Sequence, residues 1–333
     1  MRIYPVFLTN QGCPSRCVFC AQDRTTHGSP ESTPRSVKAF LDGQLPQYGT
    51  GEVAFYGGSF TLLSSALQAD YLEIAQSFVK AGRVDGIRVS TRPDALEDHQ
   101  LSRLAAAGVT TIEVGCQSFD NRVLSACGRD YTAKQAVDAI RRCRCSSFRI
   151  GLQLMPGLPE ACRDEAMISL STALKLQPDF LRIYPTVVIA GTRLARLWRE
   201  GRYQAWPLED AVDVCADMLL ACLKNGVPVI RIGLQHDRSL EDNLLDGPYH
   251  PAFGQLVRSR LWRRAVDRVP GGSPVRVNPR DLSDAIGHHA QNRLWLTQKG
   301  TGQNIQADQS VVPGWLAVDK QSWPMKELAR EGR

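Results

Sequence analysis

The sequence predicts an α/β protein: a partial (β/α)6 barrel of the TIM type with a small C-terminal extension. Three observations lead to this class. Short β-rich runs alternate with helical patterns, six such units follow one another with no sign of a reversal in strand order, and polar or glycine-rich signatures follow successive strands. In barrels of this type, the site lies at the carboxyl ends of the strands, so these signatures are expected to meet at one rim.

Each predicted strand is a short run rich in β-branched and aromatic residues, followed by a loop. The six strands are expected at residues 3–8, 52–56, 87–91, 110–115, 148–155 and 180–184. A seventh run at 227–234 is a candidate to close the sheet.

Helical periodicity of apolar residues predicts the segments between and after these strands. Helices are expected at residues 67–82, 98–108, 132–143, 164–176 and 208–226. Past Gln235 the alternation weakens and short helices mix with Gly, Pro and His. We therefore expect a core domain at residues 1–235 and a C-terminal extension at 236–333.

Composition narrows the class of protein. With 333 residues and 43% hydrophobic content, the chain can bury a large core. No stretch approaches the roughly 20 apolar residues that span a bilayer, and the apolar run at the start of the chain is too short for a signal peptide. We therefore expect a cytoplasmic protein without a membrane partner. The net charge is +6, and basic residues cluster at 257–268 and 273–280. That clustering permits an RNA partner, and the alternative is a solvated basic helix face.

Three of the ten cysteines stand within eight residues, in the order C-x3-C-x2-C at Cys13, Cys17 and Cys20. A four-iron cluster needs a ligand on each iron, so three thiolates leave one iron vacant to bind a reactive molecule. Structural zinc is the main alternative, but it usually takes four protein ligands. Clustering by chance is the third interpretation. Most other cysteines are expected to pack in the core, with a second metal at Cys143 and Cys145 as a minor alternative.

This triplet resembles the hallmark of the radical S-adenosylmethionine (radical SAM) superfamily, with the aromatic residue Phe19 just before the last cysteine. The resemblance implies a [4Fe-4S] cluster whose vacant iron is chelated by S-adenosylmethionine. One electron from the cluster then cleaves S-adenosylmethionine to methionine and a 5'-deoxyadenosyl radical. It further implies an electron donor such as a flavodoxin or ferredoxin. It leaves the oligomeric state open.

Two glycine- or serine-bearing segments extend the resemblance. FYGGSF, after the second strand, is similar to the family's Gly-Gly motif, whose carbonyls receive the methionine amino group and which stands here as Gly57 and Gly58. The Glu that commonly follows is Ser59 in this chain. After the third strand, STRPDAL resembles the ribose-contacting segment, with Ser90 where many relatives carry Glu.

Later strands add three cofactor-binding residues by the same resemblance. Gln117 matches a residue that hydrogen-bonds the nucleoside, Arg129 one that meets the cofactor carboxylate, and Gln153 a ribose-binding polar residue. An arginine fork suits a carboxylate. The segment GRDYT departs from the usual R-G-H-T, which makes Asp130 and Tyr131 changed neighbours of the cofactor.

A narrower resemblance covers roughly residues 1–260. VSTRPD, EVGCQS and RIYPTVVIAGTRLARLWREGRY resemble the radical SAM domain of the catalytic subunit of Elongator, a wobble-uridine tRNA enzyme, and still more closely bacterial radical SAM proteins of about this length. The resemblance implies a tRNA nucleoside as candidate substrate and tRNA as candidate partner. Fewer than 100 residues follow Gln235, without a Gly-rich loop for acetyl-CoA, so acetyl transfer is not expected.

Two alternatives stay open at this point. The first is the same radical chemistry on a small molecule or a tetrapyrrole, by a more distant likeness to oxygen-independent coproporphyrinogen oxidase. The second is a non-catalytic iron-sulfur redox sensor or binding module, which would keep the cluster and never cleave S-adenosylmethionine.

Overall fold

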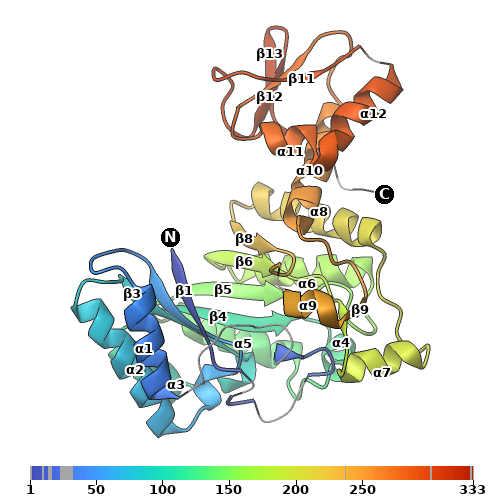
Figure 1. The fold of residues 1–333 in the computed structure, drawn as a ribbon. Helices are drawn as coiled ribbons and strands as arrows, with labels where there is room; N and C mark the ends of the chain where they lie inside the picture. The colour runs from blue at the N-terminus through green and yellow to red at the C-terminus, as the bar shows by residue number, and fades with distance from the viewer. Residues whose placement is uncertain are drawn as a thin grey trace.

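The structure is a computed structural model that describes residues 2–9, 11–13, 17–22, 33–236, 238–300, 302–330 and 332. Its central feature is a curled seven-stranded sheet in which every strand pair is parallel (Figure 1). The strands, in spatial order, are β1 (Ile3–Phe7), β2 (Glu52–Tyr56), β3 (Gly86–Thr91), β4 (Val109–Gln117), β5 (Arg149–Leu154), β6 (Phe180–Ile183) and β8 (Val229–Ile232).

Sequence order and spatial order agree along this sheet, because helical crossovers carry the chain from each strand to the next. These helices are α1 (Pro34–Gln44), α2 (Ser65–Lys80), α3 (Asp98–Ala106), α4 (Asn121–Ala126), α5 (Ala133–Arg144), α6 (Arg163–Lys175), α7 (Arg193–Arg199) and α8 (Leu208–Lys224), with short 3-10 turns η2 (Phe60–Leu62) and η3 (Pro93–Ala95). All six predicted strands and all five predicted helices are confirmed, with bounds that differ by a few residues.

One face of the sheet packs under the helices and forms the core. Phe55, Val89 and Ile112, from successive strands, are fully buried there. The seventh predicted strand is present as β8, and it pairs with β6. The order of the described strands begins at β1 and ends at β8, so the sheet stays open and the prediction of a partial barrel is confirmed.

The chain after β8 first returns to the barrel. β9 (Leu244–Asp246) follows α9 (Arg238–Asn243) and pairs antiparallel with β7 (Val188–Ile189), and α10 (Phe253–Val266) packs on α8. A small four-stranded sheet follows, at the top of Figure 1. Its unit contains β10 (Val275–Val277), α11 (Leu282–Ile286), η4 (His288–Ala290), α12 (Gln291–Lys299), β11 (Ile305–Ala307), β12 (Trp315–Val318), β13 (Gln321–Pro324) and α13 (Met325–Leu328). The predicted boundary between residues 235 and 236 stays a prediction.

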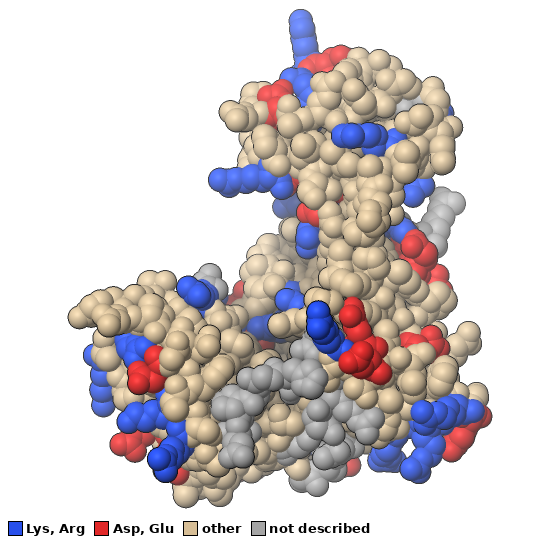
Figure 2. Space-filling view, in the orientation of Figure 1, with Lys and Arg blue, Asp and Glu red and all other residues tan. Residues whose placement is uncertain are grey.

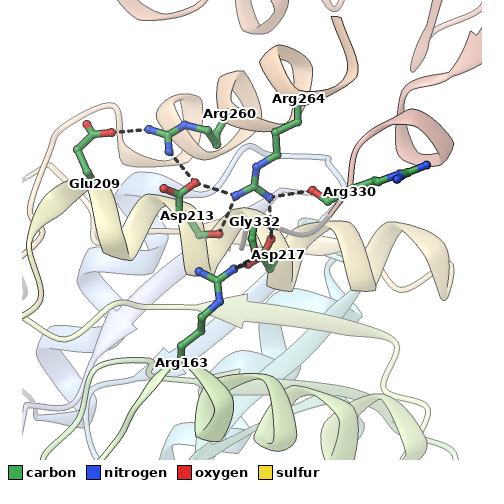
Figure 3. Close-up of polar contacts among 8 residues, drawn as sticks. All are labelled: Arg163, Glu209, Asp213, Asp217, Arg260, Arg264, Arg330 and Gly332. Atoms are coloured by element: carbon green, nitrogen blue, oxygen red, sulfur yellow. Dashed lines mark hydrogen bonds and ion pairs between the residues drawn. The ribbon is translucent and has the colours of Figure 1, made fainter. Parts of the chain in front are cut away.

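The late basic run forms part of α10, where its arginines make intramolecular contacts. Arg260 pairs with Asp213 at 2.6 Å, and Arg264 pairs with Asp213 and Asp217 at 2.7 and 2.6 Å (Figure 3). Arg258 pairs with Asp284 at 2.7 Å, and Arg263 lies over the Trp295 ring. These arginines therefore fasten α10 to α8 and to the C-terminal unit, and an RNA contact of the late basic run stays a prediction.

Among the described residues, no helix has the length and apolar character needed to cross a membrane.

Candidate functional site

The cysteine loop follows β1 and is anchored to two neighbouring segments of the barrel. The Val18 amide donates to the Cys127 carbonyl at 3.1 Å, and the Leu194 amide donates to the Val18 carbonyl at 2.8 Å. Val18 is buried against the end of α4, and Phe19 packs beside it and against α7. The segment from Cys17 to Cys20 is thereby held at the carboxyl end of the sheet by contacts far apart in the sequence.

Two glycines let the cysteine loop approach the end of β2. A Cβ on Gly58 would lie 1.8 Å from the Gln11 carbonyl oxygen, and one on Gly12 would lie 2.3 Å from the Ser59 carbonyl oxygen. The Ser59 amide donates to that Gln11 carbonyl at 3.1 Å, so the two loops are joined by a hydrogen bond. Glycine is therefore needed at Gly58 for the packing of two protein loops, in addition to any close approach of a ligand.

A cavity of about 170 Å³ lies at this rim of the sheet. Every cysteine and every cofactor-binding residue predicted from the sequence lines it: Cys13, Cys17, Phe19, Cys20, Gly57, Gly58, Ser59, Ser90, Gln117, Arg129 and Gln153. Four further lining residues are Gln22, Thr91, Arg92 and Gly115. Arg92 lies inside the STRPDAL segment, two residues after Ser90. This spacing places both side chains on the same face of an extended chain, so the sequence could have identified Arg92 as well.

Arg129 reaches the cavity on a buried side chain that Tyr131 orients. Arg129 Nη1 donates to the Tyr131 hydroxyl at 3.0 Å, and this hydroxyl donates to the Cys116 carbonyl at 3.0 Å. The Nε of Arg129 and the Nη1 of Arg92 are buried without a hydrogen-bond partner among the described residues. Because buried guanidinium nitrogens normally have partners, these two are donors left for an anionic group such as a carboxylate.

Gln117 and Gln153 meet across the β4–β5 pair, where the Gln153 amide nitrogen donates to the Gln117 side-chain oxygen at 3.0 Å. Gln117 has a φ of 67°, and the strand register shifts between Gly115 and Gln117. A left-handed backbone in a residue other than glycine is strained, and such strain gathers at binding sites. The bulge directs Gln117 into the cavity beside Gln153.

The three loop cysteines suit a cluster better than a single metal ion. The described part of the chain contains no group of three or more His, Cys, Asp or Glu residues arranged around one ion. In a [4Fe-4S] cluster each cysteine binds a different iron, so the sulfurs need not converge on one point. Burial, followed by the proximity of Cys17, raises the pKa of the Cys20 thiol to about 11, so ligation there displaces a proton.

The remaining cysteines do not line the cavity. Cys116, Cys215 and Cys222 are buried in the core, as predicted. Cys143 is buried in the same core and Cys145 is exposed, so the pair does not form a C-x-C metal site among the described residues. The thiols that face the cavity are those of the triplet.

Replacing Tyr131 with phenylalanine is expected to lower the free energy of unfolding by about 1–3 kcal/mol, because the buried Arg129 and Cys116 groups lose their partner. Urea unfolding of the two proteins measures the difference. Tyr48, which is 83% exposed, gives the matched control Tyr48→Phe, for which no change is expected. Equal losses in the two variants would contradict this assignment of Tyr131.

An open barrel of parallel strands, with a three-cysteine loop after its first strand and a polar cavity at the carboxyl rim, defines the radical SAM class. Comparison with protein families agrees. Residues 7–170 match the radical SAM superfamily, and residues 178–263 match the C-terminal radical SAM domain. The chain belongs to the radical SAM superfamily and is an enzyme of that class. Membership carries the superfamily's cofactors, a [4Fe-4S] cluster and S-adenosylmethionine.

Within the superfamily, the chain is similar to Elongator-type proteins over its radical SAM region. It is 35% identical to Elongator complex protein 3 of Mus musculus over 137 residues, which are 40% of this chain and 25% of that protein. It is 23% identical to the tRNA uridine(34) acetyltransferase of Dehalococcoides mccartyi over 74% of this chain and 62% of that protein. The chain thus spans a quarter of the first relative and less than two thirds of the second.

Solved structures agree on the fold. The archaeal Methanocaldococcus infernus Elp3 superposes with a TM-score of 0.56 at 22% identity, covering 67% of this chain and 56% of that one. Coproporphyrinogen III oxidase of Escherichia coli, a radical SAM enzyme, gives a TM-score of 0.50 at 16% identity, covering 67% of this chain and 53% of that one. At these identities the likeness is one of fold.

Proposed function

We propose that this chain reductively cleaves S-adenosylmethionine at a [4Fe-4S] cluster held by Cys13, Cys17 and Cys20. One observation carries the proposal: cofactor-binding residues predicted from segments after five successive strands all line one cavity. When bound, these cofactors supply a 5'-deoxyadenosyl radical that acts on a substrate. The protein's part is to bind and orient them and to exclude water and oxygen.

Each part of the cavity wall suits one part of S-adenosylmethionine. The unpartnered Nε of Arg129 can donate to the carboxylate, and backbone carbonyls at Gly57 and Gly58 can accept from the amino group. Gln117 and Gln153 share one hydrogen bond with each other, which leaves further amide groups for the nucleoside and the ribose. Ser59 and Ser90 are short polar side chains in the cavity wall, at positions where the resemblance to the superfamily leads one to expect Glu, and a serine leaves more room than a glutamate.

For the substrate, we propose a nucleoside in tRNA. Support comes from the names of the relatives, which include tRNA uridine(34) acetyltransferases of Methanocaldococcus infernus and Dehalococcoides mccartyi. The chain spans only 24% of the first of these, so the acetyl transfer in their name is not part of the proposal. Two α10 arginines, Arg260 and Arg264, are engaged in ion pairs with Asp213 and Asp217, so the late basic run adds no separate support for the tRNA proposal.

We expect anaerobically reconstituted native protein, reduced with dithionite, to form 5'-deoxyadenosine from S-adenosylmethionine, measured by mass spectrometry. Cys17→Ala is expected to form none, because the cluster loses one of its three protein ligands. Cys145→Ala is the matched control, since Cys145 is exposed and lies outside the cavity, and it should retain full cleavage. Iron content of all three proteins is measured beside the product.

The same assay separates the candidate functions. Faster cleavage on addition of tRNA supports an RNA substrate, whereas acceleration by a small-molecule or tetrapyrrole pool alone supports the first alternative. An intact cluster with no cleavage in the presence of any pool contradicts the proposal and leaves the sensor or binding module. The electron donor, such as a flavodoxin or ferredoxin, stays a prediction that replacement of dithionite by these proteins tests.

A further inference from the structure

A layer of charged and aromatic side chains lies inside the barrel below the cofactor cavity. Its members come from the strand face opposite the core, because their neighbours in β2, β3, β4 and β6 are buried under the helices; in β8, Ile232 is partly buried against the same core and Ile230 is exposed. They are Tyr56 on β2, Arg88 on β3, Glu113 on β4, Arg182 on β6, Tyr184 just after β6 and Arg231 on β8. We call these six residues the interior layer.

Hydrogen bonds and ion pairs join most of the interior layer. Glu113 accepts from the Tyr56 hydroxyl at 2.8 Å and pairs with Arg88 and with Arg182 Nε, the latter at 2.7 Å. Arg182 also donates to the hydroxyls of Tyr56 and Tyr184 at 2.9 and 3.0 Å. Arg88 pairs at 2.5 Å with Glu52, which lies below the layer. The two carboxylates therefore balance Arg88 and Arg182.

Arg231 adds a positive charge that nothing in this network balances. The strand register sets Arg231 directly beside Arg182 on the same face of the sheet. None of the ion pairs among the described residues includes Arg231, whose Nε contacts the Gly233 carbonyl at 3.3 Å. Two like charges side by side on neighbouring strands are unfavourable. An anion between them would remove that cost.

The interior layer lies next to the cofactor cavity. Ser90 and Gly115 of the cavity wall follow Arg88 and Glu113 by two residues on the same strands, which is a step of about 7 Å along the strand. Tyr56 directly precedes Gly57 of the cavity. Figure 2 shows Lys and Arg side chains in the hollow between the barrel and the C-terminal unit. Arg182, Tyr184 and Arg231 are all partly exposed.

We propose that Arg231 and Arg182, with the hydroxyl of Tyr184, bind an anionic group of the substrate, either a phosphate or a carboxylate. Guanidinium groups offer two parallel N–H donors that match both groups, and the Tyr184 hydroxyl, which accepts from Arg182, can add a neutral donor. The inference rests on the proposed function in taking the barrel interior as the place of the substrate. It adds that this substrate carries a negatively charged group, which would lie two residues away from the cofactor cavity along the strands.

Ligand-detected NMR titration of the reconstituted protein tests the proposal, with inorganic phosphate as one probe and malonate as the carboxylate probe. At least one of them should bind, and Arg231→Gln should weaken that binding roughly tenfold or more. Arg231→Lys, which keeps the charge, should bind more tightly than Arg231→Gln. Arg35→Gln, an exposed arginine on the outer helix α1, is the matched control and should bind like the native protein.

Several results would overturn the inference: binding of neither anion, equal affinity in the native protein and Arg231→Gln, or equal weakening by Arg35→Gln. The probe that binds distinguishes phosphate from carboxylate. Because no turnover is involved, anion binding that depends on Arg231 without cleavage of S-adenosylmethionine contradicts the proposed function alone. Cleavage by a native protein that binds neither probe contradicts this inference alone.

Discussion

Replacing Asp217 with alanine is expected to lower the free energy of unfolding by about 3–5 kcal/mol, which is the typical cost of removing one partner from a buried ion pair. Asp217 lies on α8 and its side chain is 1% exposed. It pairs with Arg163 of α6 and with Arg264 of α10, and it accepts from the Gly332 amide at 2.9 Å (Figure 3). The substitution leaves two arginines and the C-terminal segment without their shared acceptor.

Urea unfolding of the full chain measures this effect. Asp210→Ala is the matched control, because Asp210 is an exposed carboxylate in the first turn of the same helix. Its loss should cost well under 1 kcal/mol, as surface charges usually do. Similar losses in the two variants would show that the network in Figure 3 does not hold the C-terminal part of the chain to the barrel.

Replacing Gly58 with alanine is expected to reduce the iron bound per chain after reconstitution roughly severalfold and to destabilise the fold by about 1–3 kcal/mol or more. The added Cβ would overlap the Gln11 carbonyl at 1.8 Å, so the start of the cysteine loop must move away from β2. Cys13 lies two residues further on, and its Sγ is 3.7 Å from the Ser59 hydroxyl. The displacement therefore reaches Cys13, one of the three proposed cluster ligands.

Gly43→Ala is the matched control, because a Cβ at Gly43 in α1 meets nothing within 4 Å. This variant should bind the native amount of iron, with stability unchanged or slightly raised, since alanine favours a helix over glycine. Iron analysis and thermal unfolding of both variants decide the question. Full iron loading of a Gly58→Ala protein would mean that the contact between the two loops is not needed for the cluster.

The strands were predictable because the strand-forming runs in this chain are short and separated by clear helical periodicity. The sheet buries such runs on both faces, as in β2, where Glu52, Val53, Ala54 and Phe55 are all buried. The cavity was predictable for a related reason. Parallel strands place their carboxyl ends at one rim, so motifs after successive strands had to meet there.

Other features depended on contacts between distant residues. Tyr131 stood out only as a departure from a family pattern, and its role in orienting Arg129 depends on a turn that brings it under β4. The ion pairs of Arg260 and Arg264 could not be predicted, because their acidic partners lie 45 or more residues earlier in the chain, on α8. Charge runs in a sequence carry no information about such partners.

The sequence by itself determined the class of this protein: the order of strands and helices, the three-cysteine loop and the residues around the cofactor cavity. Each of these follows from local patterns or from the order of motifs along the chain. Only the tertiary structure decided that α10 is locked to α8, that Gly58 serves loop packing, and that Arg231 lies beside Arg182 without an ion pair among the described residues. The net charge and the unpaired donors of a site depend on residues that are far apart in the sequence and that only the fold brings together.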